Sequence, residues 1–249
     1  MYPSSEEHSI TLPIVDPSVD TPYLPLVFNV LALYWGEDLT SFISKDTKSR
    51  YNNVRGSILI EGIELAEKHG FRSLMYKSNM KDLRKSIDQG IPIITILPGI
   101  RDLVQHATIV CGYNQQERRI LTYVPMEKTQ GAVPEKRFEK EWEEDDTNSI
   151  ILIPSDMTEI ISNTEFRFSE SNRLCLTAER LRLQGNSEKA VEELSTAINV
   201  DSDNPQAWYA LGSAYSDQRL KEAVDCFDRA IRLNKRYYLA YRGLGNFYL

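Results

Sequence analysis

The stretch Asp16–Gly36, DPSVDTPYLPLVFNVLALYWG, is a polar, Pro-rich turn that leads into an apolar helix. Pro22 and Pro25 suit a helix start, where the missing N–H would be unpaired in any case. Apolar side chains then recur at helical spacing, and Gly36 is a typical stop: Leu26, Val27, Val30, Leu31 and Tyr34. The sequence therefore predicts a buried helix. Its first turn, where a helix N-terminus most easily activates a nucleophile, is held by Tyr23.

Composition narrows the classes of protein that this chain can represent. It has 249 residues, enough for two ordinary domains, and a net charge of −7, which argues against nucleic-acid binding. The N-terminus lacks a secretory signal pattern, and the apolar run 91–97 is too short to cross a bilayer, so no membrane insertion is expected. Three cysteines without CxxC spacing predict buried thiols in a reducing cytoplasm. Three scattered histidines predict no metal site, and we expect no cofactor.

The first part of the chain mixes helical and strand patterns. Helices are predicted at 37–50, 56–69 and 80–89, and Phe138 and Trp142 mark the apolar face of another. Strands are predicted at 11–15, 71–76, 91–97, 106–113, 120–124 and 149–153. The acidic run from Glu139 to Asp146 is interpreted most simply as a solvated face.

Beyond residue 169 the chain is helical and repeats itself. One set of positions is echoed by a second: Leu174, Ala178, Ala190, Leu194 and Ala197 by Trp208, Gly212, Ala223, Phe227 and Ala230. A third echo begins at Tyr241, with Leu244, Gly245 and Tyr248. The pattern W-x-x-L-G-x-x-Y over Trp208–Tyr215 resembles the tetratricopeptide repeat (TPR), in which small residues let paired helices approach closely. This resemblance implies a solenoid that binds proteins or peptides.

The order of landmarks in the first 155 residues resembles the C39-type, papain-like cysteine peptidases. The matching positions are Tyr23-Leu24-Pro25 at the start of the helix and Tyr34-Trp35-Gly36 at its end, Gly90–Ile94, His106 before Gly112-Tyr113, Val124-Pro125, and Phe138 with Trp142. The resemblance implies a fold of helices plus an antiparallel sheet. It also implies a catalytic Cys at the helix start, a His base, an Asp that orients it, and a Gln as oxyanion donor.

This chain departs from that pattern at three of the four positions. Tyr23 stands at the Cys position, and its phenol is a poor nucleophile. Val124 stands at the Asp position, Asp16 lies near the Gln position, and only His106 remains. The sequence therefore predicts a degenerate site and no peptidase activity. Some C39-like domains of secretion transporters, which carry Tyr in place of Cys and hold their substrate without cutting it, are similar in this respect.

Other nucleophiles are weak alternatives. Cys111 follows His106 by five residues on one predicted strand, so alternation directs their side chains to opposite faces. Ser18 and Thr21 suit turns or helix caps better than catalysis. His106 could be a vestige, a core residue, or part of a ligand groove beside Tyr23 and Trp35; Trp35 could equally be a core residue.

We therefore expect an α+β papain-like domain at 1–155, a linker at 156–169 and an all-α TPR solenoid at 170–249. The leading hypothesis is a non-catalytic binding or scaffold protein; the alternatives are a hydrolase that uses His106 with an unrecognised nucleophile, and a purely structural subunit. The candidate peptide-binding residues are Tyr23, Trp35 and His106 in the first domain, and Asn172, Glu179, Gln206, Tyr209, Ser213, Arg242 and Asn246 on the concave face of the repeats.

Overall fold

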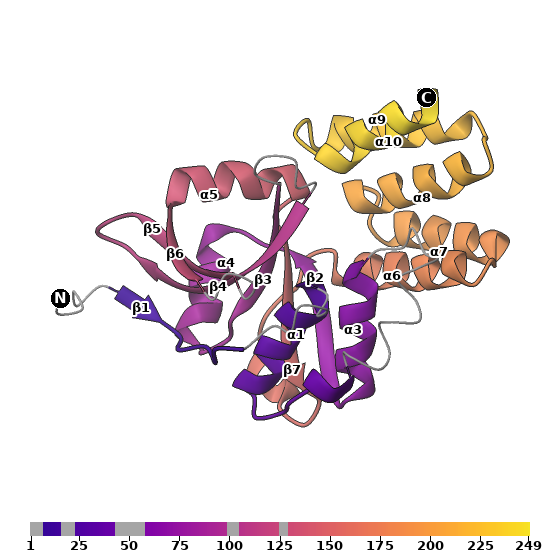
Figure 1. Cartoon of the computed structure of the whole chain (residues 1–249). Coiled ribbons are helices and arrows are strands. Elements are labelled where there is room, and N and C mark those ends of the chain that lie inside the picture. Colours follow the sequence, from indigo (N-terminus) through magenta and orange to yellow (C-terminus); the bar gives the residue numbers. More distant parts are fainter. Residues whose placement is uncertain (1–6, 16–22, 43–57, 99–104, 125–128) are drawn as a thin grey trace. The chain divides into compact units, whose positions relative to one another are not determined.

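The structure is a computed structural model that describes residues 7–15, 23–42, 58–98, 105–124 and 129–249 (Figure 1). The chain divides into two compact units. The first comprises Met1–Leu74, Ser78–Glu141 and Ser149–Glu165. The second comprises Met75–Lys77, Trp142–Asn148 and Phe166–Leu249, so it is discontinuous in sequence. The domain limits expected from the sequence stay predictions.

The first unit is organised around the predicted apolar helix, α1 (Tyr23–Tyr34). Its side chains from Leu26 to Ala32 are all at most 3% exposed. They are apolar except for the amide Asn29. Asn29 accepts a hydrogen bond from the Leu39 N–H (2.7 Å) and donates one to Thr40 (3.0 Å), so the buried amide is satisfied. Gly36, with φ of 97°, adopts the left-handed conformation that ends a helix.

Helix α3 (Ile58–Lys68) contacts α1, and a glycine sets how closely the two approach. A Cβ added at Gly62 would lie 2.4 Å from the ring of Phe28, which has no exposed surface. Alanine normally improves a helix interior by about 1 kcal/mol over glycine, but overpacking a core costs about 1–3 kcal/mol. The free-energy cost of overpacking should therefore exceed the gain in helix propensity at position 62.

We expect Gly62→Ala to lower the free energy of unfolding by up to about 2 kcal/mol, the overpacking cost less the helix-propensity gain. Urea unfolding of the full chain measures the loss, and amide hydrogen exchange should locate it in α1 and α3. The matched control is Gly245→Ala, since a Cβ at Gly245 in α10 meets nothing within 4 Å. A loss of stability in the control, or a gain in Gly62→Ala, would contradict this account.

The sheet has seven strands in the order β2-β7-β3-β4-β5-β6, with β1 paired to β4. Their bounds are β1 (Glu7–Ser9), β2 (Phe71–Lys77), β3 (Ile93–Pro98), β4 (Gln105–Asn114), β5 (Arg119–Val124), β6 (Thr129–Pro134) and β7 (Asn148–Pro154). The β3–β4, β3–β7, β4–β5 and β5–β6 pairs are antiparallel. Helices α4 (Met80–Asp88) and α5 (Glu135–Trp142) complete this part of the fold with the short turn η3 (Thr158–Ile161).

Three predictions of elements need correction. The expected edge strand at 11–15 is wrong: the strand is Glu7–Ser9, and only Ile10 continues it, through its N–H to the Cys111 carbonyl (2.7 Å). Strand β6 was not predicted, because Gly131 and Pro134 obscure its short alternating pattern. Of the helix predicted at 37–50, Thr40–Phe42 are helical and 43–50 lie outside the described residues.

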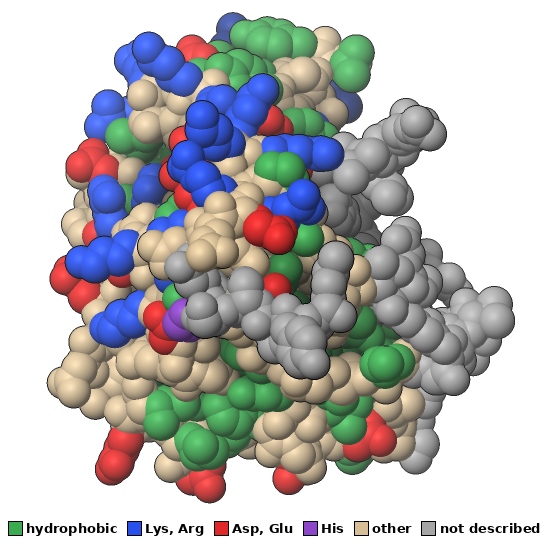
Figure 2. Space-filling view, turned by 90° about the vertical axis from the view of Figure 1, so that its left-hand side faces the viewer, with side chains coloured by type: hydrophobic (Ala, Val, Ile, Leu, Met, Phe, Trp, Pro, Cys, Tyr) green, Lys and Arg blue, Asp and Glu red, His purple; other side chains and the backbone are tan. Residues whose placement is uncertain are grey.

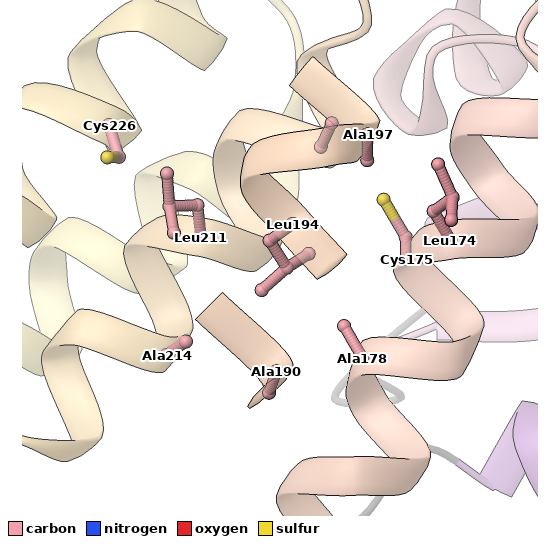
Figure 3. Close-up of a cluster of buried hydrophobic side chains, with 10 residues drawn as sticks. Leu174, Cys175, Ala178, Ala190, Leu194, Ala197, Leu211, Ala214 and Cys226 are labelled. Carbon is pink, nitrogen blue, oxygen red and sulfur yellow. The ribbon is translucent and has the colours of Figure 1, made fainter. Parts of the chain in front are cut away.

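The second unit contains five helices after residue 166. They are α6 (Ser169–Leu183), α7 (Ser187–Val200), α8 (Pro205–Asp217), α9 (Glu222–Leu233) and α10 (Tyr238–Tyr248). Helix α6 packs on α7 and α8 packs on α9, as the sequence repeat predicts. Figure 3 shows Ala190 and Leu194 of α7 lying between α6 and α8, in a cluster whose small side chains let the helices approach closely.

Glycines on two helices accommodate one aromatic ring of this unit. A Cβ added at Gly212 on α8 would lie 2.7 Å from the ring of Phe227, and one at Gly243 on α10 would lie 2.6 Å from it. The Phe227 ring, 1% exposed, is therefore held between two helices that only glycine allows so close.

The chain has a net negative charge, but its surface is not uniformly acidic. Figure 2 shows a face on which Lys and Arg side chains gather, with Asp and Glu scattered among them. The net charge of −7 is therefore an average over faces of different character.

Candidate binding sites

The positions that the sequence assigns to a peptidase site lie on three elements of the first unit. Tyr23 is the first residue of α1, which contacts β4. His106 is the second residue of β4 and pairs with Leu97 of β3, and Val124 ends β5. The backbone thus carries these positions on α1, β4 and β5, and the roles assigned to their side chains stay predictions.

Trp35 connects the end of α1 to the sheet. Its indole Nε1 donates a hydrogen bond to the Leu152 carbonyl of β7 (2.8 Å). The neighbouring Tyr34 ring meets it edge-on, and the Tyr34 hydroxyl donates to the Gly90 carbonyl (2.8 Å). Trp35 is half-buried and has this structural role, and its expected role in binding stays a prediction.

None of the three cysteines of the chain is placed as a nucleophile. All are free and buried. Burial raises the pKa of Cys111 to about 11, that of Cys175 to about 12 and that of Cys226 to about 11. Because the thiolate is the reactive form, these thiols are chemically quiet at neutral pH.

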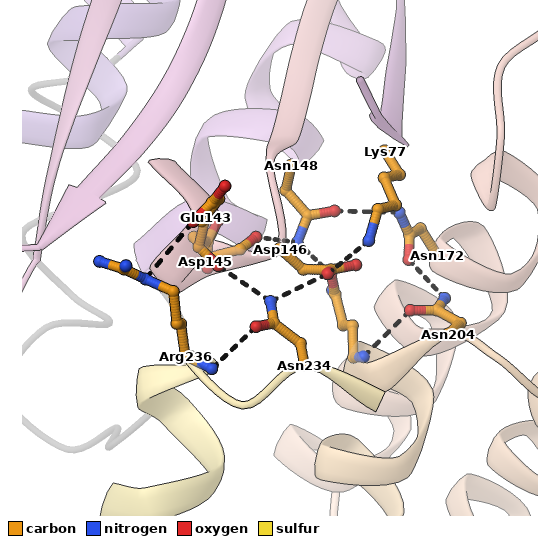
Figure 4. Close-up of polar contacts among 10 residues, drawn as sticks. Lys77, Glu143, Asp145, Asp146, Asn148, Asn172, Asn204, Asn234 and Arg236 are labelled. Atoms are coloured by element: carbon orange, nitrogen blue, oxygen red, sulfur yellow. Dashed lines mark hydrogen bonds and ion pairs between the residues drawn. The ribbon is translucent and has the colours of Figure 1, made fainter. Parts of the chain in front are cut away.

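A buried polar network occupies one side of the second unit (Figure 4). Asn204 donates from Nδ2 to the Asn172 side-chain oxygen (2.8 Å) and to the Ser171 hydroxyl (2.9 Å). Asn172 in turn donates to the Met75 carbonyl (3.3 Å), and Asn148 donates to the Gln206 side-chain oxygen (3.1 Å). The network provides hydrogen bonds to side-chain amides whose burial would otherwise cost free energy.

An acidic pair lies in the same network. Asp146 accepts hydrogen bonds from Lys77 Nζ (2.6 Å) and from Asn234 Nδ2 (3.0 Å), and Asn234 also donates to the Glu143 carbonyl (2.9 Å). Asp145 and Asp146 are 4% and 3% exposed. The prediction that the acidic run is a solvated face is therefore wrong for these two residues, because the chain turns inward after Trp142.

Asp145 and Tyr237 form an unusual pair of buried polar groups. Asp145 Oδ2 and the Tyr237 hydroxyl are both buried, and neither makes a hydrogen bond to the described residues. Burial, and then the neighbouring Asp146, raise the pKa of Asp145 well above its usual range. Burial, and then Asp145, raise the pKa of Tyr237. Asp145 therefore favours its neutral form in the folded chain.

This raised pKa gives a pH dependence with a defined sign. The folded state holds the Asp145 proton more tightly than the unfolded state, so stability falls as pH rises from about 4 through the higher folded pKa. We expect Asp145→Asn, which is neutral at every pH, to be more stable than wild type at pH 8 by about 1–3 kcal/mol. The two should differ little at pH 4.

Urea unfolding at pH 4, 6 and 8 measures the slope for both proteins. Asp156→Asn is the control, because Asp156 is exposed and its substitution should leave the slope unchanged. An Asp145→Asn variant with the wild-type slope, or one less stable than wild type at pH 8, would show that the buried carboxyl does not govern this dependence.

The residues predicted on the concave face have different surroundings. Asn172 is fully buried and Gln206 is half-buried, and both belong to the network. Glu179 forms an ion pair with Arg182 (2.6 Å). The Tyr209 ring packs on the rings of Phe227 and Tyr237, with 6.0 Å between ring centroids in each pair. Of the remaining three, Ser213 and Arg242 are half-buried, with the Arg242 guanidinium over the Tyr238 ring, and only Asn246 is exposed. The structure does not gather all seven into one open surface.

The network itself was not predicted. Its members lie far apart in the sequence, as Lys77, Asp146 and Asn234 illustrate, and pair through side chains that have no periodic pattern. Local signals exist for Asn204, which caps α8 by accepting from the Gln206 N–H (3.0 Å), and for Asn234, which accepts from the Arg236 N–H (2.9 Å).

Comparisons with known proteins match one segment in each part of the chain. Residues 31–150 match the model of the Peptidase_C39 like family, and residues 178–218 match the model of the TPR repeat. The chain thus carries a C39-like peptidase domain followed by a tetratricopeptide repeat region. Among curated relatives, the Cell division cycle protein 27 homolog of Caenorhabditis elegans is 41% identical over 59 residues, 23% of this chain. The chain spans only 8% of the length of that relative.

Solved structures similar to this chain come from peptidase domains. The peptidase domain of Streptococcus ComA, a bi-functional ABC transporter involved in a quorum sensing pathway, is 21% identical, with a TM-score of 0.44. That likeness covers 59% of this chain and 98% of the ComA domain. A double glycine motif protease from an AMS/PCAT transporter, solved with its leader peptide, is 12% identical, with a TM-score of 0.43 over 59% of this chain and 94% of the protease.

No other class of site is evident in the described part of the chain. Among the residues that the structure describes, no three His, Cys, Asp or Glu side chains are grouped to hold a metal ion. Within the same ranges, every helix falls short of the length and apolar character that crossing a bilayer requires.

Proposed function

We propose that this protein is a non-catalytic binding or scaffold protein, in which a degenerate C39-like domain and a TPR region hold partner proteins or peptides. The observation that carries the proposal is chemical. A peptidase of this type needs a reactive thiolate, and all three thiols of the chain are buried with pKa values raised to about 11 or 12.

The substitutions in the sequence support the same proposal. Tyr23 holds the nucleophile position at the start of α1, and Val124 holds the position of the orienting Asp. A phenol ionises near pH 10 and a valine accepts no hydrogen bond, so neither supplies the missing role. Only His106 remains of the four catalytic positions.

The binding role has two candidate surfaces. In the repeats we propose Ser213, Arg242 and the exposed Asn246 as the binding positions, since Asn172 and Gln206 are engaged within the network. In the first unit, the half-buried Trp35 supplies an aromatic ring near the end of α1, with Tyr23 and His106 as further candidates. Free, buried cysteines fit a cytoplasmic location.

An active-site probe experiment tests the absence of catalysis. The full chain and its His106→Ala variant are treated with thiol-directed and serine-directed covalent probes at pH 7.5, beside an active C39 peptidase as positive control. We expect no covalent label on either form. Labelling of the wild type that disappears in His106→Ala would overturn the proposal in favour of a hydrolase.

Affinity capture from a native extract tests the binding role. The bait is the full chain, and the matched bait carries Arg242→Glu and Asn246→Ala. We expect the wild-type bait to retain proteins or peptides that the variant loses. A heterogeneous peptide pool would indicate a peptide binder, whereas one stoichiometric protein would indicate a scaffold. Equal capture by both baits would exclude this surface.

A further inference from the structure

Strand β6 is an edge of the sheet. It lies at one end of the strand order, and within the ranges that the structure describes its only strand partner is β5 (Figure 1). The pairing is antiparallel and keeps one register from Thr129 to Pro134. In an antiparallel ladder, alternate residues of an edge strand direct their N–H and C=O groups away from the partner. Strand β6 therefore carries main-chain donors and acceptors that β5 does not use.

The main chain of β6 is open to solvent. Gln130, Ala132 and Pro134 are exposed, and Gly131 and Val133 are half-buried. Because Gly131 has no side chain, the surface that it exposes is main chain. The small residues at positions 131 and 132 leave the neighbouring peptide groups unscreened, so another extended chain can approach this edge closely.

The usual protection of an edge strand is missing from β6. Proteins protect such edges with charged side chains or with prolines inside the strand. Strand β2, at the other end of the strand order, carries Arg72 and Lys77, whereas β6 has no charged residue. Pro134 is the last residue of β6, so its missing N–H ends the row of donors without interrupting it. The edge is therefore suited to pairing along its whole length.

Positively charged residues flank the Pro134 end of this edge. Arg119 is the partner of Pro134 in the ladder, and the Arg118 carbonyl accepts a hydrogen bond from the Glu135 N–H (2.8 Å). Helix α5 then begins directly after β6, with the exposed Lys136 in its first turn. Two cationic segments, one on each side of the β5–β6 pair, thus meet at this end of the edge.

The carboxylates of the same region already have cationic partners. Glu117 pairs with Arg119 (3.3 Å), Glu135 with Arg84, and Glu141 with Arg137 (2.7 Å). Lys136 makes no ion pair with the described residues, and the Arg118 guanidinium lies 3.8 Å from the Glu135 carboxylate that Arg84 already holds. Glu139 and Lys140, further along α5, carry opposite charges. The cations that stay available are therefore Arg118 and Lys136, and they favour an acidic ligand.

We propose that β6 binds an extended, acidic segment of a partner protein, which adds to the sheet as an antiparallel strand. Main-chain hydrogen bonds supply the pairing, and Arg118 and Lys136 select the charge and the direction of the segment. An antiparallel strand begins where β6 ends, so the acidic residues stand at the N-terminal side of the segment. The inference deepens the proposed binding function and rests on it, because it names a surface of the first unit and the kind of segment that this surface holds.

A designed peptide tests the pairing. The probe is Asp-Glu-Asp-Thr-Val-Thr-Val-Thr, amidated and labelled with a fluorophore at its C-terminus. We expect saturable binding to the full chain by fluorescence anisotropy, and slower amide hydrogen exchange in residues 129–134 when the probe is bound. The same peptide N-methylated at all five Thr and Val residues keeps its charge but loses its main-chain donors, so it should bind at least tenfold more weakly.

Charge and direction are tested with variants of the chain and of the probe. An Arg118→Glu, Lys136→Glu chain should bind the probe at least tenfold more weakly. The matched control is Lys189→Glu, Lys221→Glu, which changes the net charge equally at two exposed lysines of the repeat region and should bind as wild type does. The peptide Thr-Val-Thr-Val-Thr-Asp-Glu-Asp should bind several-fold more weakly, because only the less stable parallel pairing places its acidic residues beside Lys136.

The outcomes separate this inference from the proposed function. Absence of saturable binding, equal binding of the N-methylated probe, or slowed exchange outside residues 129–134 alone would overturn strand addition at β6. Equal binding by the Arg118→Glu, Lys136→Glu chain would overturn the selection of acidic segments. If the probe fails while the affinity capture described above still distinguishes its two baits, β6 is excluded and the proposed binding function stands.

Discussion

Replacing Trp142 by alanine is expected to lower the free energy of unfolding by about 3–5 kcal/mol, the largest single loss we expect in this chain. The side chain has no exposed surface, and its indole Nε1 donates to the Asn148 carbonyl (2.9 Å). Alanine would leave a cavity and an unsatisfied carbonyl inside the segment that carries Asp145 and Asp146. Urea unfolding of the full chain, followed by circular dichroism, measures the loss.

Two variants separate the cavity from the hydrogen bond. Trp142→Phe keeps most of the volume and loses only the indole donor, so it should cost clearly less than Trp142→Ala. Trp208→Ala removes an indole that is only half-buried and should also cost less. If Trp208→Ala proved the more damaging of the two alanine variants, the central role assigned to Trp142 would be wrong.

Replacing Lys77 by methionine is expected to cost about 3 kcal/mol at pH 7, because it leaves a buried carboxylate without its cation. Lys77 Nζ lies 2.6 Å from Asp146 Oδ1, and the Asp146 side chain is 3% exposed. Burial raises the pKa of Asp146 while Lys77 opposes that rise, so removing Lys77 should raise the pKa further. The loss should therefore shrink as pH falls and the carboxyl takes up a proton.

A double-mutant cycle measures the coupling between the two side chains directly. Lys77→Met combined with Asp146→Asn should recover much of the stability lost by Lys77→Met alone, since no unpaired buried charge remains. Lys81→Met, at an exposed lysine of α4, is the matched control and should change little. Strict additivity of the two substitutions would mean that Lys77 and Asp146 do not stabilise each other.

These predictions concern the side of the repeat region that the network occupies. The sequence suggested that Asn172 and Gln206 face a ligand. In the structure, Asn172 bonds to Asn204 and the Met75 carbonyl, and Gln206 to Asn148, all within the second unit. We therefore expect a partner of this region to meet Ser213, Arg242 or the exposed Asn246.

Much of the fold could be predicted because its signals are local. The period of Leu26, Val27, Val30 and Leu31 indicated α1, and β-branched runs indicated β3, β4 and β7. The spacing of Ala178, Gly212 and Gly245 indicated three equivalent helices. Strand β6 was not predicted because a short edge strand with Gly131 and Pro134 has little periodic signal. Strand β1 was misplaced because its three residues are all exposed and carry no apolar pattern.

The features of the candidate sites also fall into two groups, those that the sequence predicts and those that depend on packing. The prediction of a degenerate site rests on the identity of Tyr23 and Val124, so the sequence alone can make it. That the three thiols have raised pKa values follows from burial, which depends on packing around Cys111, Cys175 and Cys226.

The sequence by itself determined the two kinds of domain and the apolar helix α1, because periodicity and residue identity are properties of neighbouring positions. Only the tertiary structure decided that Asp145 and Asp146 turn inward and meet Lys77, Asn234 and Tyr237. A charged run has the same sequence pattern in solvent as in a buried network. What distinguishes the two is desolvation and long-range pairing, and both arise only when distant segments come together.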